Sequence, residues 1–417
     1  MALKDTLRRW SVRLDSWATF KSLLRRVLPR RALLFYYQHR YGSETDLEEN
    51  AKIFALTQDR TFPIDLYNSE KVMIILVPEH NTMSGGIYSC FSIAREMRRL
   101  KKHHGYDVLV MTRPNRCQLT YFRNTNFLNS ENVYRFEQIC LCKSAKQIYL
   151  HIPEYAGDSF ADLISNQELR YLLNRDVHVN ILNQNIKLMP DKEGLSGLRD
   201  IASGVSQSVA HHAYFTQAVA NQYDLPTLLL PAYTDLTPYQ ASSFEEKEKL
   251  IIYSPDEKPY KNECLEKISR RLPDFKLIEI RDITFDRFMD YATRCMFSIT
   301  FGEGFDGYLA QTIHQGGIGF AVYDDDFFPS RRFKAYENIF EDGAEMLRCI
   351  CNRMLRLTQD EQAYEGLNEK WRSEYCKLYS YDEYVEQIKK LSLKQFEIWP
   401  VVQLNRQPAR APSRPDL

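Results

Sequence analysis

The stretch from Cys295 to Asp326, CMFSITFGEGFDGYLAQTIHQGGIGFAVYDDD, decides the fold of this chain. It predicts a strand over Met296 to Thr300, a glycine-rich loop, a short helix that stops at Gly316-Gly317, and a second strand over Ile318 to Tyr323. A strand, a helix and a second strand in this order form a β-α-β unit, the building block of a mostly parallel sheet. The stretch therefore places the chain in the α/β class.

The glycine-rich loop of this unit carries the chemistry. Glycines at a strand-to-helix junction let backbone N–H groups approach a ligand closely, and the positive end of the helix dipole favours an anion there, usually a phosphate. Glu303 lies inside the loop, where its carboxylate would repel a phosphate. We therefore expect Glu303 to face sugar hydroxyls. The alternative is an ordinary glycine turn, which any doubly wound fold contains.

The segment Glu303-Gly304-Phe305-Asp306-Gly307 resembles the donor-site signature of retaining GT-B glycosyltransferases of the family 4-like type. In that signature an EGFG-type loop precedes a helix, and a second glutamate follows the first in an E-x7-E pattern. This chain carries Gln311 at the second position, which departs from the pattern. An amide still hydrogen-bonds a diol, although without the charge assistance of a carboxylate.

The resemblance implies a role for each residue of the loop. Glu303 would be catalytic and would hold the transferred sugar, and Gln311 would bind the ribose of the donor. The other donor-binding positions of the loop are Gly304, Phe305, Asp306 and Gly307. The alternative for Glu303 is that it caps the following helix and serves stability instead of catalysis.

An earlier part of the chain predicts the start of a first doubly wound domain. A strand over Val72 to Val77 precedes Gly85 and Gly86, and a helix follows from Ile87 to about Lys102. The resemblance places the two glycines under the donor diphosphate, with a tight turn as the alternative. Further strands are predicted at 108–111, 148–152, 177–182, 209–212 and 228–230.

Polar residues stand near the ends of two of these strands, where the carboxyl edge of a parallel sheet forms binding sites. His151 is the second-to-last residue of the predicted strand 148–152. Asn183 and Asn185 follow the end of the next predicted strand. His151 is a candidate catalytic residue near the reacting sugar, with a hydrogen-bonded structural histidine as the alternative. We expect less of His211 and His212, because the segment after them predicts a surface helix.

A second domain is expected to begin with the strand Leu250 to Tyr253. In the family that the loop resembles, a basic segment after this strand neutralises the departing diphosphate. Ser254-Pro255 replaces the usual Gly-Arg pair, which leaves Lys258 as a donor-binding residue and Lys261 as a catalytic one. The alternative for both lysines is an ordinary solvated surface position.

The expected architecture is therefore GT-B: two Rossmann-like doubly wound domains that face each other across a cleft, with a basic helical N-terminal extension. The boundaries are predicted at 1–70 for the extension and connector, 71–238 for the acceptor-side domain, 239–249 for a linker and 250–365 for the nucleotide-sugar domain. Helices over 366–395 would cross back to the first domain. Residues 405–417, rich in proline and arginine, predict a disordered tail.

Composition limits the cofactors and the compartment. The 417 residues are 44% hydrophobic and 13% aromatic, which is typical of a folded protein with large cores. The nine cysteines show neither disulfide nor zinc spacing, and no apolar run approaches the roughly 20 residues of a spanning helix. We expect a cytoplasmic protein without a cofactor. The triplet Asp324-Asp325-Asp326 is not expected to bind a metal, because basic groups of two domains replace the metal in this architecture.

The first 40 residues carry ten Lys or Arg but only two Asp. Because the net charge of the whole chain is zero, the rest of the chain is acidic. Leucines and tryptophans recur there at spacings of three and four between the basic residues, which predicts an amphipathic helix over 1–34. Its apolar side would bind an anionic membrane surface, or pack on the protein's own domain or a second subunit. Nucleic-acid binding is not expected, because no nucleic-acid-binding fold accompanies the charge.

The resemblance implies a glycosyltransferase that moves a sugar from a nucleotide-sugar donor to a glycan or lipid-linked acceptor with retention, and by analogy a role in capsule or O-antigen synthesis at the inner face of the cell membrane. One alternative is a catalytically silent GT-B subunit that organises partner enzymes, which Gln311 and Ser254-Pro255 favour. Another is a polyol-phosphate transferase of the same fold.

If residues 1–34 dock on anionic lipid, each basic side chain near the surface contributes about 1 kcal/mol and the binding weakens as salt is added. Co-sedimentation with liposomes should therefore retain the full chain at low salt and lose a chain that starts at Ser43. Equal partitioning of the two chains would leave protein packing as the role of the helix.

Overall fold

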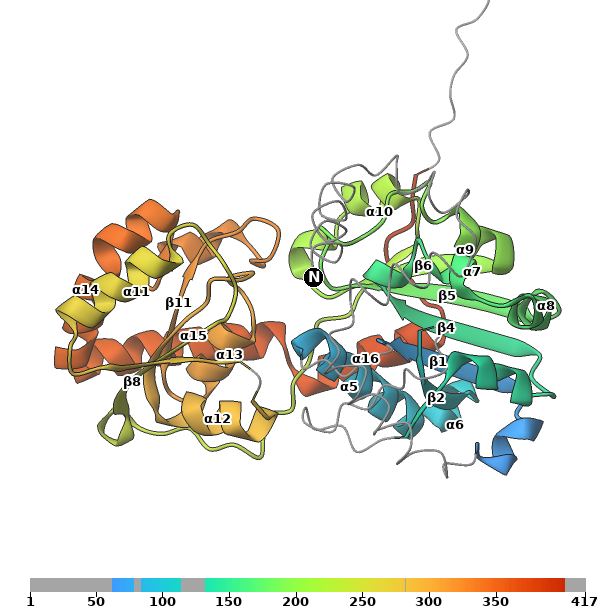
Figure 1. Ribbon diagram of the computed structural model, residues 1–417, viewed down its shortest axis with the longest axis horizontal. Coiled ribbons are helices and arrows are strands. Elements are labelled where there is room, and N and C mark those ends of the chain that lie inside the picture. Colours follow the sequence, from blue (N-terminus) through green and yellow to red (C-terminus); the bar gives the residue numbers. More distant parts are fainter. Residues whose placement is uncertain (1–61, 79–83, 114–131, 282, 402–417) are drawn as a thin grey trace, which may run out of the picture.

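The computed structural model describes residues 62–78, 84–113, 132–281 and 283–401, and it shows two α/β domains (Figure 1). The predicted basic helix and the predicted tail lie outside the described residues. Within the described residues, no helix combines the length and the apolar character that a membrane span requires.

The first domain is built on a parallel sheet of seven strands in the order β3-β2-β1-β4-β5-β6-β7. This is the classic Rossmann order with one more strand, and the direction of winding reverses between β1 and β4. The strands are β1 (Lys71–Val77), β2 (Asp107–Thr112), β3 (Val133–Tyr134), β4 (Gln147–Pro153), β5 (Asp176–Asn183), β6 (Gly204–Val209) and β7 (Thr227–Leu229).

Helices cover both faces of this sheet, which explains why its central strands are apolar on both sides. One face packs on the α5 helix, and the other packs on short helices between β4 and β7. The helices are α5 (Gly85–Arg99), α6 (Lys101–His104), α7 (Phe160–Leu163), α8 (Asn166–Leu173), α9 (Ser196–Ile201) and α10 (Gln217–Tyr223).

The second domain contains a parallel sheet of five strands in the order β12-β11-β10-β8-β9, which reverses between β8 and β10. Its strands are β8 (Glu248–Tyr253), β9 (Lys276–Glu279), β10 (Cys295–Ile299), β11 (Ile318–Val322) and β12 (Ile339–Phe340). Its helices are α11 (Lys261–Arg271), α12 (Phe285–Arg294), α13 (Gly307–His314), α14 (Gly343–Gln359) and α15 (Glu361–Leu378). The helices α12 and α13 lie against one face, and α11 and α14 pack on the opposite face.

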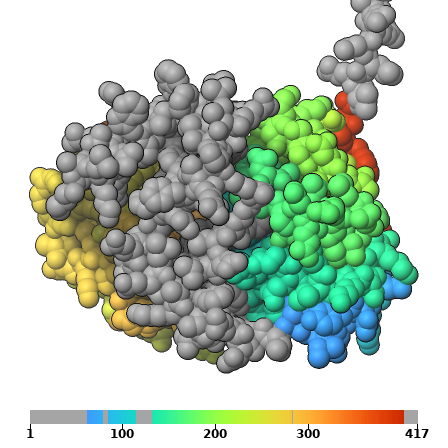
Figure 2. All heavy atoms as spheres, turned by 45° about the vertical axis from the view of Figure 1, so that its right-hand side comes forward, coloured from blue at the N-terminus to red at the C-terminus, as the bar shows by residue number. Residues whose placement is uncertain are grey.

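The chain returns to the first domain after α15. The last helix, α16 (Tyr381–Ser392), lies beside α5, and the Tyr384 hydroxyl lies 3.1 Å from the Ser92 hydroxyl. Beyond it, the Thr227 backbone N–H donates to the Ile398 carbonyl at 2.8 Å, so the C-terminal segment adds to the edge strand β7. Figure 2 shows this red segment against the green surface of the first domain. Helix α16 therefore packs on the first domain, although it directly follows the last helix of the second.

Most predicted strands are present within one or two residues, but one was placed wrongly. The sequence analysis assigned 209–212 to a strand, whereas β6 ends at Val209 and a short 3-10 helix begins at His212. The buried polar side chains of Ser206, Gln207 and Ser208 hid the strand, because they break the apolar pattern while they bond within the sheet. The helix α14 was also not predicted.

An aromatic side chain of the second domain packs into the core of the first. Phe327 lies on the segment after β11 of the second domain, yet it is 3% exposed and belongs to the apolar core of the first. Its ring packs against His211 and Tyr214, and the Lys187 ammonium lies 4.7 Å from the ring centre. The next residue, Phe328, points into the core of its own domain. These two neighbouring phenylalanines therefore pack in the hydrophobic cores of different domains.

This pair provides a matched test of what holds the domains together. Phe328→Ala should lower the stability of the second domain by about 3 kcal/mol, as is usual for a large buried ring. Phe327→Ala should cost less, because water can refill a site between domains, but it should loosen the arrangement and raise the radius of gyration. Calorimetry and small-angle scattering measure the two effects. Equal losses of stability with unchanged radii would contradict this assignment.

Candidate functional site

The two sheets reverse their winding at points that lie beside one another. In doubly wound sheets, ligands bind outside the carboxyl ends of the strands at this reversal. In the first domain these ends lead into Gly85 and Glu154, and in the second they lead into the loops before α11 and α13. The Asn185 amide donates to the Glu303 carboxylate at 3.2 Å, so the two edges are in contact.

Glu303 stands at the centre of this contact. Its side chain is 37% exposed, and its second oxygen lies 3.9 Å from Nε2 of His211. Burial lowers the pKa of His211 to about 4, so this neighbour is a neutral imidazole near pH 7 and not an ion-pair partner. Both first-domain contacts to Glu303 are therefore made by uncharged groups.

The electrostatic surroundings of Glu303 oppose its ionisation. Partial burial raises its pKa to about 7, and the carboxyl groups of Asp306, Asp256 and Glu154 act in the same direction. The Lys187 ammonium opposes them, but it is bound to Asp324 at 3.3 Å and to Asp326 at 3.2 Å. A carboxyl group with a pKa near 7 can bind or release a proton at physiological pH, which is common in functional sites.

The remaining residues of the predicted donor loop have separate roles. Gly304 adopts a φ of 87°, and a Cβ there would lie 2.7 Å from the Val322 carbonyl, so the position requires glycine. Phe305 is buried among aromatic rings of its own domain. A Cβ on Gly307 would meet Oε1 of Gln311 at 2.4 Å, and this oxygen has no hydrogen-bond partner in the described structure. Gln311 therefore points back over the loop.

Asp306 is the residue that caps α13. Its Oδ1 accepts from the backbone N–H groups of Tyr308 at 2.9 Å and Leu309 at 3.2 Å, and the Thr300 hydroxyl donates to its other oxygen. The alternative that Glu303 caps the helix is therefore wrong. Both carboxyl oxygens of Asp306 already have partners within the protein. Its predicted contact with the donor stays a prediction.

The predicted catalytic lysine is buried. Lys261 is the first residue of α11 and is 4% exposed, and its ammonium donates to the Pro255 carbonyl at 3.0 Å. Glu257 and Glu279 also lie within 3.3 and 3.4 Å of it. Its role toward a diphosphate stays a prediction. Lys258 is half-buried, and its carbonyl accepts from the Lys261 backbone N–H.

The two glycines of the first domain stand at the start of α5. Gly85 has open space where a Cβ would project, whereas a Cβ on Gly86 would meet Oε1 of Gln184 at 2.8 Å. The Gln184 amide donates to the Gly86 carbonyl at 3.2 Å, which ties the start of α5 to the end of β5. The two predicted donor-binding glycines therefore lie beside the segment that leads to Asn185.

His151, the third predicted catalytic residue, lies within the sheet. It is 1% exposed and is paired in register with Asn180 of β5. Burial lowers its pKa to about 4, which keeps the imidazole neutral. The structure does not bring His151 into contact with Glu303, and its role in catalysis stays a prediction.

Sequence reasoning undervalued two residues that contact Glu303. His211 was given little weight because the segment after it predicts a surface helix, although it follows the end of β6 by two residues and lies 3.9 Å from Glu303. Asn185 was noted as a strand-end residue but not chosen. Its position directly after β5, close to the reversal of the sheet, was the signal that could have identified it.

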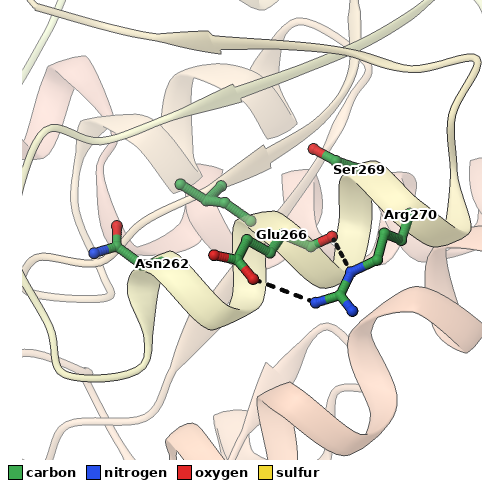
Figure 3. A pocket seen from close by; sticks show the side chains of 5 residues that line it. Asn262, Glu266, Ser269 and Arg270 are labelled. Carbon is green, nitrogen blue, oxygen red and sulfur yellow. Dashed lines mark hydrogen bonds and ion pairs between the residues drawn. The ribbon is translucent and has the colours of Figure 1, made fainter.

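Two other features of the described residues do not join this site. No group of three or more His, Cys, Asp or Glu side chains could hold a metal ion. A hollow on the exposed face of α11 is lined by Asn262, Leu265, Glu266, Ser269 and Arg270 (Figure 3). Glu266 and Arg270 pair with each other there at 3.3 Å. None of the predicted site residues lines this hollow.

The assignment of the helix cap to Asp306 and not to Glu303 can be tested by the free energy of unfolding of variants. Asp306→Ala removes an N-cap and should cost about 1 kcal/mol of unfolding free energy. Glu303→Gln keeps an oxygen for the Asn185 amide and should change stability by no more than about 0.5 kcal/mol. Urea denaturation of both variants measures the difference, and the opposite order would restore Glu303 as the structural residue.

Comparison with known proteins gives a likeness of structure and none of sequence. No family model and no curated protein matches the chain. An α-glucosyltransferase solved with UDP-glucose and DNA containing an abasic site superposes with a TM-score of 0.51 at 9% identity, over 77% of this chain and 99% of that one. Sucrose-phosphate synthase from Thermosynechococcus elongatus gives 0.47 at 10% identity, over 78% and 98%.

At such identities the likeness concerns the fold alone. The α-glucosyltransferase shares the arrangement of two parallel-sheet domains over almost its whole length. The two sheet orders, the α16 helix that returns to the first domain and this superposition agree with one another. This chain has the GT-B fold.

Proposed function

We propose that the protein is a glycosyltransferase that transfers a sugar from a nucleotide-sugar donor to a hydroxyl acceptor. The observation that carries the proposal is the half-exposed carboxyl group of Glu303, which stands where the carboxyl ends of both sheets meet and is contacted by Asn185 of the other domain. The likeness to an α-glucosyltransferase that was solved with UDP-glucose supports this assignment. A donor would lie against the second domain, and the acceptor would approach from the first.

The proposed reaction retains the configuration of the sugar. The bond between the anomeric carbon and the phosphate oxygen breaks, a bond to the acceptor oxygen forms on the same face, and the acceptor proton passes to the departing phosphate. The N-terminal end of α13 and its neighbouring amides would stabilise the negative charge of the diphosphate. Lys261 and the nearby Arg281 would add positive charge, and Glu303 would hold hydroxyls of the sugar.

Lys261 needs a rearrangement before it can meet a phosphate, because Glu257 and Glu279 bind it. Glu257 is exposed, so an incoming diphosphate could displace it at little cost, since exposed ion pairs contribute about 1 kcal/mol or less. A second candidate is a catalytically silent GT-B subunit that binds no donor and organises partner enzymes. It is supported by the ion pairs that occupy Lys261 and by Gln311 in place of a glutamate.

The proposed setting is the synthesis of a cell-surface polysaccharide such as capsule or O-antigen, with a glycan or lipid-linked acceptor at the inner face of the cell membrane. This part of the proposal rests on the resemblance of the 303–311 segment and on the basic composition of residues 1–34. Because the proposed chemistry assigns the charge of the diphosphate to protein groups, it requires no metal and no cofactor.

The test is a panel of UDP-, GDP-, dTDP- and ADP-sugars, with binding followed by calorimetry and turnover by nucleotide release. We expect one donor class to bind and to release nucleotide. Glu303→Gln should bind the free nucleotide as the wild type does but lower kcat by about 100-fold, because the sugar is misplaced.

The matched control is Glu266→Gln, the same chemical change on the exposed face of α11 (Figure 3). It should leave binding and turnover unchanged. A wild-type protein that binds none of the panel would favour the silent subunit. A Glu303→Gln protein with full turnover would remove Glu303 from the donor site.

A further inference from the structure

Glu154 is a buried carboxyl group at the winding reversal of the first sheet. It directly follows β4, next to the point where the strand order turns from β1 to β4, and it is 3% exposed. Among the described residues it lies in no ion pair, and no arginine or lysine contributes to its pKa. Glutamate is rarely buried this deeply without such a partner.

One oxygen of Glu154 has a structural task and the other has none. Oε1 accepts from the Asn185 backbone N–H at 3.2 Å, which anchors the segment after β5. Oε2 is inaccessible to solvent and has no hydrogen-bond partner among the described residues. A buried carboxyl oxygen without a donor is costly, so its presence requires an explanation outside the resting fold.

The carboxyl group of Glu154 lies close to the proposed donor site. The residue whose backbone it binds, Asn185, also donates its side-chain amide to Glu303 at 3.2 Å. Glu154 raises the pKa of Glu303 and of Cys90 on α5 through its charge, which places it between the Glu303 loop and α5. Two carboxyl groups, one from each domain, therefore meet around one asparagine.

Anchoring the segment does not explain the choice of glutamate. A glutamine would accept the same backbone N–H with one oxygen and would avoid the burial of an ionisable group. A carboxyl group differs from the amide at its second oxygen, which can accept a hydrogen bond from a hydroxyl or, when protonated, donate one. Burial raises the pKa of Glu154 to about 7, so both forms exist near neutral pH.

We propose that Glu154 is a specificity-determining residue of the site, and that its free oxygen binds a sugar hydroxyl beside the one held by Glu303. The inference rests on the proposed function and deepens it, because it names a first-domain contact to the carbohydrate. The hydroxyl belongs either to the transferred sugar or to a carbohydrate acceptor. Both sources present the same chemistry to the carboxyl group, and the experiment separates them.

The experiment compares the wild type with Glu154→Gln, using UDP, UDP-glucose and the donor that the panel identifies, together with octyl glycosides as acceptors. Calorimetry gives the affinities for free nucleotide and for nucleotide sugar, and steady-state kinetics give the acceptor KM. Glu168→Gln is the matched control, because Glu168 is also a buried first-domain carboxylate that accepts a backbone N–H, but it caps α8.

We expect Glu154→Gln to bind UDP within about twofold of the wild type. If the hydroxyl belongs to the donor, the affinity for the nucleotide sugar falls about tenfold. If it belongs to the acceptor, the donor affinity stays and the acceptor KM rises by a similar factor. If Glu154 only anchors its segment, neither changes, because glutamine keeps the anchor, and this result would overturn the inference.

Two further outcomes are also decisive. If Glu154→Gln does not fold, as shown by its thermal transition, Glu154→Asp replaces it, because the shorter side chain keeps a carboxylate but withdraws the second oxygen. Unchanged kinetics and affinities in that variant would overturn the inference. A wild-type protein that binds no nucleotide sugar would remove the proposed function and this inference together, whereas unchanged Glu154 variants would remove the inference alone.

Discussion

The structure depends on how the carboxyl edges of two parallel sheets are brought together. Each edge gathers loops that end in polar groups, and the winding reversal leaves those loops without a covering helix. Facing edges therefore bring carboxyl groups into a partly dry space, where Glu303, Asp306 and Glu154 all have raised pKa values. The Lys187 ammonium of the first domain pairs across this junction with Asp324 and Asp326 of the second, and apolar and neutral contacts add to these ion pairs. Phe327 and the Asn185 amide provide such contacts.

The same junction explains why the last helix matters for the site. Helix α16 packs on α5, whose first turn contains Gly85 and Gly86, while α15, the helix before it, packs in the core of the second domain. Helix α16 therefore connects the second domain to the helix that carries Gly85 and Gly86. Residues from both domains form the contacts around Glu303.

The sequence predicted the parts of this structure that have local causes. Alternating apolar runs and glycine stops identified the strands and the Glu303 loop, because strand-to-helix turns need glycine where φ is positive, as at Gly304. The sequence offered Glu303 as an alternative cap of α13 and did not point to Asp306, which the backbone geometry shows to be the cap. His211, Asn185 and Glu154 lie far from Glu303 along the chain. Their proximity follows from how the domains pack, which no local pattern records.

The carboxyl groups also determine how the fold responds to pH. A raised pKa means that the folded state holds more protons than the unfolded chain between about pH 4.5 and pH 7 for Glu154 and Glu303. Their contribution to stability is therefore favourable below pH 4.5 relative to neutral pH, and it is lost as the pH rises through 7. The buried histidines act in the opposite direction below pH 6.5, since burial lowers the pKa of His151 and His211 to about 4. Near neutral pH the histidines no longer titrate, whereas the junction keeps a buried carboxyl oxygen of Glu154 that has no hydrogen-bond partner among the described residues, which is costly. A hydroxyl that reaches this oxygen relieves that cost, so the same burial that weakens the empty junction favours an occupied one.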